Sequence, residues 1–110
     1  MITEQEVDKA LAYLRDTAGP AAIARANVAY STEFIKIVRA KVKTAQIGMS
    51  NAAAEDVALT SDDYLHAIEA MRAAVEDDSR YRFLREAADA KIRAWQTEQA
   101  SLRAEGRAYG

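Results

Sequence analysis

The sequence of 110 residues contains no cysteine and a single histidine, His66, and these shortages exclude several kinds of chemistry. Without cysteine the chain has no disulfide framework and no cysteine-ligated metal site. Nucleophilic catalysis requires a serine, threonine or cysteine activated by a neighbouring base, and no GxSxG elbow is present. The glycine-rich phosphate loops GxGxxG and GxxxxGK(S/T) are also missing. We therefore expect a protein that is not an enzyme and that binds no cofactor.

His66 invites a metal-site interpretation, because Asp63 and Glu69 lie three residues to either side of it. Carboxylate metal sites in helical bundles use two Glu-x-x-His motifs that project inward. Here a single Asp-x-x-His spacing occurs, and zinc sites usually need three or four ligands. We interpret His66 as a half-exposed helical residue and expect no metal.

Large apolar side chains are scarce. Half of the residues are hydrophobic, but 25 of these 55 are alanines. This supply is thin for a compact core, and it would be enough for a long thin helical protein or for one that shares its core with a second copy. We therefore expect a homodimer. The chain begins MITEQEVDKA, with acids where a signal peptide would be basic and then apolar, and no stretch approaches the ~18 apolar residues of a membrane span. We expect no membrane partner and a cytoplasmic location.

Charge is distributed unevenly, although the net charge is only −2. Residues 1–19 sum to −2, residues 20–49 to +4, residues 50–79 to −7 and residues 80–110 to +3. Two basic segments therefore flank an acidic one. Either the segments neutralise each other within the fold, or they form separate surfaces for a partner.

Apolar residues recur with the helical period and no strand pattern competes, so the sequence predicts an all-α fold. Gly19-Pro20 is expected to separate the first two helices, because Gly follows helix ends and Pro suits a first turn. Thr3, Ser50, Ser61 (or Thr60) and Ser79 are candidate caps. The predicted helices span about 3–17, 20–47, 51–58, 61–76 and 80–105. We expect a single domain over residues 1–110, built as a long antiparallel helical hairpin, coiled-coil-like, with shorter flanking helices.

Two apolar stripes are candidates for the core or for an oligomer seam. In the second helix Ile23, Tyr30 and Ile37 are seven apart, and Phe34 interleaves with them. In the last helix Tyr81, Trp95 and Leu102 share a seven-residue spacing, with Ile92 between them. Trp95, the single tryptophan, is therefore interpreted mainly as a packed seam residue, and exposure to a partner is the alternative.

Basic residues form the candidate nucleic-acid surface. Lys36, Arg39 and Lys43 share one helical face. The last helix adds Arg82, Arg85 and Arg93, which would lie beside this face if the long helices pair antiparallel. Such rows can follow the phosphates of single-stranded DNA without base specificity. The alternative is an ordinary solvated face, or one neutralised by the acidic segment.

The sequence resembles a family of small helical proteins encoded by tailed bacteriophages and prophages. The resemblance rests on MITEQEVDKALAYLRDTA, on RANVAYSTEFIKIVRAKVK and on the segment YLHAIEAMRAAVEDDSRYRFLREAADAKIRAWQTEQASLRAEG. It is strongest around Ala88, Lys91, Ile92, Trp95, Arg103 and Gly106. It implies an early-region gene near recombination genes and a place in the host cytoplasm, and it brings no catalytic or binding residues with it.

Two functions remain open. One is a non-enzymatic accessory protein in phage DNA recombination or replication, which binds nucleic acid or a phage or host DNA-processing protein. The alternative is a counter-defence protein that inhibits a host nuclease or CRISPR-type complex by protein–protein contact. A continuous basic face would favour the first function, and a dominant acidic surface would favour the second.

Overall fold

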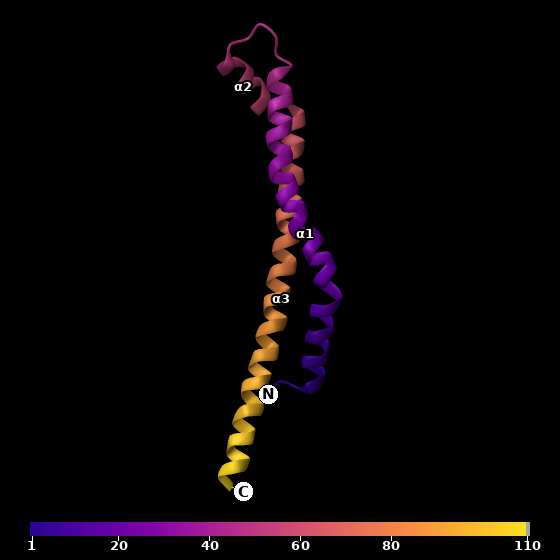
Figure 1. Cartoon of the computed structure of the whole chain (residues 1–110), viewed down its shortest axis with the longest axis vertical. Coiled ribbons are helices and arrows are strands. Elements are labelled where there is room, and N and C mark those ends of the chain that lie inside the picture. Colours follow the sequence, from indigo (N-terminus) through magenta and orange to yellow (C-terminus); the bar gives the residue numbers. More distant parts are fainter. Residues whose placement is uncertain (110) are drawn as a thin grey trace. The chain divides into compact units, whose positions relative to one another are not determined.

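The computed structural model describes residues 1–109 and contains three helices in that range. α1 spans Glu4–Thr44, α2 spans Asn51–Leu59 and α3 spans Asp62–Tyr109. Figure 1 shows α1 in indigo to magenta, the short α2 after it, and α3 in orange to yellow. No strand occurs in residues 1–109, so the all-α prediction is confirmed.

The chain divides into two compact units, and both long helices run through both units. Unit 1 contains Met1–Ala21 and the part of α3 from Arg80 onward, and unit 2 is Ala22–Ser79. Within unit 1 the backbone N–H of Ile2 donates to Glu98, and Arg85 contacts Leu14. Residue numbers therefore rise along α1 as they fall along α3, which confirms the antiparallel hairpin. Unit 2 adds α2, the single short helix between the two long ones.

Side chains at the predicted capping positions begin the helices. Before α1, the Thr3 backbone N–H donates to Glu6 and the Glu6 backbone N–H donates to the Thr3 hydroxyl, which is a capping box. Ser50 accepts from the Ala53 backbone N–H at the start of α2. At the start of α3 the Ser61 hydroxyl accepts from the Tyr64 backbone N–H. These local hydrogen bonds satisfy donors that the first helical turn leaves unpaired.

The predicted break at Gly19-Pro20 is wrong, because α1 continues through it from Glu4 to Thr44. Proline has no N–H for the Asp16 carbonyl, so the helix loses one hydrogen bond there. The covered positions Leu14, Thr17 and Ala21 nevertheless remain in phase across the proline. Tertiary packing on this face offsets the local cost, as it often does for long amphipathic helices.

The predicted boundary between helices 61–76 and 80–105 is also wrong, since α3 is continuous from Asp62 to Tyr109. Asp and Ser are modest helix formers but, unlike Gly and Pro, they do not break a helix. The covered positions Ala74, Asp78, Tyr81 and Arg85 continue the same spacing through this segment. The 76–79 run therefore lies within the helix, half-buried at positions 77–79, and Ser79 is not a cap.

The facing sides of the two long helices follow a seven-residue repeat. Buried or half-buried positions alternate in steps of three and four, which is the spacing of a coiled-coil seam. In α1 they are Val7, Ala10, Leu14, Thr17 and Ala21 in unit 1, and Ala24, Val28, Ser31, Ile35, Val38 and Val42 in unit 2. In α3 they are Tyr64, Ala67, Met71, Ala74 and Asp78 in unit 2, and Tyr81, Arg85, Ala88, Ile92, Trp95 and Gln99 in unit 1.

The core made by these seams is thin. Among the described residues the buried apolar side chains are Val7 and five alanines, and no large side chain is fully enclosed. Small seam residues let the helix backbones approach closely, but each buries little apolar area. Much of the larger apolar surface therefore stays exposed within a single chain.

Candidate functional site

The first basic triad, Lys36, Arg39 and Lys43, meets carboxylates within unit 2. Lys36 pairs with Glu33 on its own helix at 3.2 Å. Arg39 and Lys43 both pair with Glu55 of α2, the Lys43 Nζ lying 3.6 Å from the carboxylate. The triad is therefore partly neutralised by the acidic segment, which was one of the two alternatives left by the sequence.

Glu55 connects α2 to α1. The hydrogen bond from Arg39 lowers the pKa of the Glu55 carboxyl, partial burial opposes this shift, and the charges of Arg39 and Lys43 add to it. The carboxylate therefore stays ionised well below neutral pH. Its charge lies where phosphate would have to bind, so it competes with nucleic acid for these two cations.

The second basic triad, Arg82, Arg85 and Arg93, serves three different local roles in unit 1. Arg93 pairs with Asp89 one turn earlier at 2.5 Å. The Arg82 guanidinium lies 5.1 Å from the ring centre of Phe83, within cation–π range. Arg85 is half-buried and faces α1.

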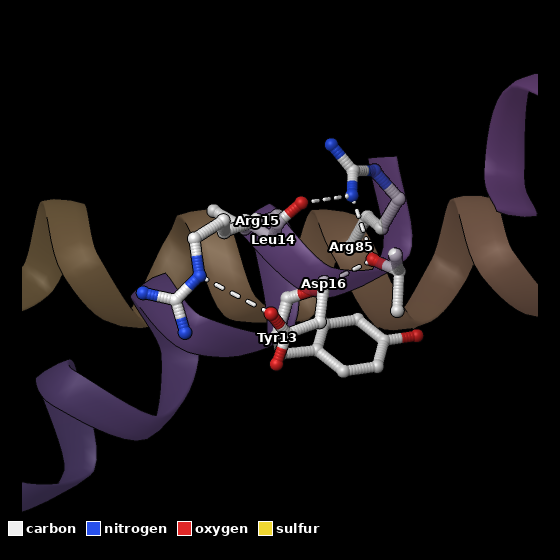
Figure 2. A network of polar contacts seen from close by, with 6 residues as sticks. Tyr13, Leu14, Arg15, Asp16 and Arg85 are labelled. Carbon is white, nitrogen blue, oxygen red and sulfur yellow. Dashed lines mark hydrogen bonds and ion pairs between the residues drawn. The ribbon is translucent and has the colours of Figure 1, made fainter. Parts of the chain in front are cut away.

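Arg85 forms the main polar contact between α3 and α1 in unit 1. Its Nη1 donates to the Leu14 carbonyl and to the Thr17 hydroxyl, both at 2.7 Å. The Thr17 hydroxyl in turn donates to the Tyr13 carbonyl at 2.6 Å. Figure 2 shows this network, with the exposed Arg15–Asp16 pair on the neighbouring surface. A guanidinium used in this way fixes helix register and is not free to meet phosphate.

The two triads belong to different units. The residues that contact Arg85 are Leu14 and Thr17 of unit 1, whereas Lys36, Arg39 and Lys43 are in unit 2. In α1, Leu14 and Thr17 precede Lys36 by 22 and 19 residues, which is about three heptads. A single surface made of all six residues therefore remains a prediction.

The predicted seam residues of α1 lie outside the intrachain seam. Ile23 is 64% exposed, Tyr30 67%, Phe34 39% and Ile37 49%. They form a row adjacent to the covered positions Ala24, Val28, Ser31, Ile35 and Val38. The core alternative is therefore excluded for these four residues within one chain, and the oligomer alternative remains a prediction.

The predicted seam residues of α3 behave differently. Tyr81, Ile92 and Trp95 are half-buried at positions that face α1 within unit 1, as a seam role requires. Leu102 continues the spacing but is 43% exposed. The Ile2–Glu98 hydrogen bond shows that α1 begins near Glu98, so α1 offers Leu102 little cover.

A groove of about 470 Å³ lies along one side of unit 1. Its lining residues are Glu6, Lys9, Ala10, Tyr13, Leu84, Ala87, Ala88 and Lys91. The Tyr13 hydroxyl is covered and has no hydrogen-bond partner in the described part of the chain. The groove is thus lined by three alanines, the apolar Leu84, the charged Glu6, Lys9 and Lys91, and Tyr13. Its charges did not stand out in the sequence, because the residues are distant along the chain.

Unit 2 has a groove of about 370 Å³ on one side of the α1–α3 pair. Phe34, Val38, Lys41 and Val42 of α1 and Asp63, His66, Ala67 and Ala70 of α3 line it. His66, interpreted from the sequence as a half-exposed helical residue, is exposed at the edge of this groove. No group of three or more residues able to hold a metal ion occurs within residues 1–109.

Comparison with known proteins brings no assignment: no protein-family model, curated protein or solved structure matches the chain. Within residues 1–109, none of the helices has a stretch both long and apolar enough to span a membrane.

Proposed function

We propose that the protein is a non-enzymatic accessory factor that acts by helix-mediated protein contact. One observation carries this proposal: the basic side chains predicted to contact nucleic acid are largely engaged within the chain, whereas large apolar side chains are not covered. Lys36, Arg39, Lys43 and Arg93 have carboxylate partners, and Arg85 is bonded to α1. Exposed apolar area drives protein association more than nucleic-acid binding does.

The unit 1 groove supports a protein partner in particular. Its alanine floor at Ala10, Ala87 and Ala88 leaves space for side chains of a helix, and Leu84 is 50% exposed at its edge. A partner helix that packs apolar side chains against these alanines and Leu84 fits this groove.

The resemblance to phage and prophage proteins supplies the context for this proposal. A phage DNA-processing protein is the first candidate partner, with a role in recombination or replication. A host nuclease complex is the second candidate, and this counter-defence alternative is favoured by the acidic balance of residues 50–79, which carry eight acidic and one basic residue. The protein would bind either candidate partner by protein–protein contact.

The test is affinity capture from phage-carrying cells, with matched variants of the groove. Leu84→Glu and Ala87→Arg place a charge at the groove, and Ala104→Arg places one on exposed α3 surface away from it. We expect a specific protein that is retained by the wild type and by Ala104→Arg and is lost with both groove variants. Equal retention by all four forms would exclude the groove as the contact site.

A parallel measurement separates protein contact from nucleic-acid binding. Labelled single-stranded and duplex DNA are titrated with the wild type and with a Lys36→Glu, Arg39→Glu, Lys43→Glu triple variant at low salt. We expect no binding, or weak binding that falls steeply with salt. Tight DNA binding by the wild type that the triple variant loses, with unchanged helical content, would replace the proposal with the DNA-binding hypothesis.

A further inference from the structure

We infer that a second copy of this chain covers the exposed face of unit 2, with α1 of each copy packed on α3 of the other. The face is defined here by Ile23, Tyr30, Phe34 and Ile37 of α1 and by Ala70 and Ala73 of α3, and is called the dimer face. Its position in unit 2 keeps the inference separate from the proposed partner groove in unit 1.

The α1 side of the dimer face is a bulky ridge. Ile23, Tyr30 and Ile37 are spaced seven apart, and Phe34 lies one turn from Tyr30, so all four share one helical face. The rings of Tyr30 and Phe34 stack with centroids 5.7 Å apart and planes at 14°. Because stacking already restricts both rings in the free chain, each ring loses less conformational entropy when it binds. This favours their use as anchors.

The α3 side of the dimer face is a shallow track. Phe34 and Lys41 line the same groove as Asp63, His66 and Ala70, so these α1 and α3 residues flank one side of the helix pair. Ala73 lies three residues after Ala70 and seven after His66, which places it on the same helical face. Both alanines are exposed. A ridge of large residues beside a track of small ones is self-complementary, as an interface between identical copies requires.

Charge decides which helices meet. On the side of the helix pair that carries Phe34 and Ala70, α1 presents the basic Lys41 and α3 presents the acidic Asp63. Packing α1 on its own copy would place like charges opposite each other, and the same would hold for α3. Packing α1 on α3 of the second copy pairs opposite charges instead. Of the two twofold arrangements of facing hairpins, the one with its axis along the helices brings α1 over α3.

The dimer face alone has about half the area of one side of a standard interface. From Ile23 to Ile37 the helix rises about 21 Å at 1.5 Å per residue. Two helices packed 8–10 Å apart present a face about 20 Å wide. The product is about 420 Å², against the ~800 Å² per partner of a standard interface, before side-chain relief and the rest of unit 2 are counted. The core within one chain is thin, so a second copy would also stabilise the fold. It would bury large side chains that a single chain leaves exposed to water.

An axis along the helices also fixes the pairing between copies. It keeps each residue at its own height, so an α1 residue faces the α3 residue that lies at the same height in its own chain. Phe34 of α1 and His66 of α3 line one groove, so they lie at the same height. Residues of α1 and α3 therefore share a height where their two residue numbers add up to about 100. Asn27 should therefore face Ala73 of the second copy.

The first test is the mass in solution, by light scattering and sedimentation. We expect about twice the 12.1 kDa of one chain. Tyr30→Glu should raise the dimer dissociation constant at least tenfold, whereas Phe83→Glu should leave it unchanged. The two side chains are matched, because Tyr30 is 67% and Phe83 61% exposed, but Phe83 lies in unit 1. A wild-type monomer at high micromolar concentration, or equal dissociation constants for both variants, would overturn the inference.

The second test uses the absence of cysteine in the native chain. Asn27→Cys and Ala73→Cys are prepared as separate chains, mixed and oxidised, since both positions are exposed. We expect the mixed disulfide between the two variants to form at least tenfold faster than either homodisulfide. Rapid homodisulfide formation by Asn27→Cys alone would mean that α1 packs on α1, and a dimer without the mixed disulfide would place the interface elsewhere. This test also decides the matter if Tyr30→Glu fails to fold.

Discussion

The Arg85 guanidinium donates a 2.7 Å hydrogen bond to the backbone carbonyl of Leu14, a residue 71 positions earlier in the chain. The same nitrogen donates to the Thr17 hydroxyl, so one side chain of α3 contacts a full turn of α1 just before Pro20. A charged donor at a seam position has few alternative partners of equal quality. It therefore favours one register of the antiparallel pair in unit 1 over its neighbours.

Arg85→Met tests this role. Methionine keeps much of the apolar stem and removes the donors, so we expect unit 1 to lose about 2 kcal/mol of unfolding free energy, the range of hydrogen bonds to charged groups. Urea unfolding followed by circular dichroism measures the change. Arg93→Met is the control, because its pair with Asp89 is highly exposed and should contribute less than about 0.5 kcal/mol. Equal effects of the two variants would contradict a register role for Arg85.

Pro20→Ala should stabilise the protein by about 1–3 kcal/mol, because alanine restores the N–H for the Asp16 carbonyl and removes a ring that crowds it. The side chain of Pro20 is exposed, so little packing is lost. Thermal unfolding gives the comparison. Gly19→Ala should add a smaller gain of about 0.5–1 kcal/mol, since a Cβ there meets nothing within 4 Å. Destabilisation by both substitutions would mean that the chain needs a break at 19–20 after all.

Trp95→Ala should destabilise the protein by about 2–3 kcal/mol, at the low end of the cost for large-to-alanine changes, because the indole is half-buried in the α3 seam. Trp95 is the single tryptophan, so its fluorescence reports this position without interference. We expect an emission maximum shorter than that of indole in water, which shifts to longer wavelength on unfolding. Emission at the fully hydrated position in the native protein would contradict a seam role.

The attachment of α2 to α1 should weaken in acid. Arg39 and Lys43 lower the folded-state pKa of Glu55, so the ion pair adds stability above the ordinary glutamate range near about 4.3, and this contribution is lost as the pH falls through the lower folded-state pKa. Hydrogen exchange of the α2 amides, corrected for intrinsic rates, should rise over that interval. In Glu55→Gln the exchange should be faster already at neutral pH and should change less with acid. Identical exchange in both proteins would exclude Glu55 as the connection.

The amino-acid sequence by itself determined the secondary structure class and the local starts of helices. Thr3 with Glu6, Ser50 and Ser61 act through groups three residues away, so short-range chemistry is sufficient to predict them. The seven-residue spacing of Tyr81, Ala88 and Trp95, with Ile92 between the last two, likewise identified the covered face of α3, because periodicity fixes which residues share a face.

Tertiary structure decided which of two adjacent stripes of α1 is covered and whether a local breaker ends the helix. Ala24, Val28 and Ile35 are covered while Tyr30 is exposed, although the larger side chains favour the opposite choice. The small residues of the covered stripe allow close contact with the alanines of α3. This fit depends on both helices together, so the apolar periodicity of either helix alone does not predict it. The same holds for the continuous helix at Pro20, just before which Arg85 bonds to Leu14 and Thr17, and for Arg39, which pairs with Glu55. These contacts join residues far apart in sequence, so local propensity does not predict them.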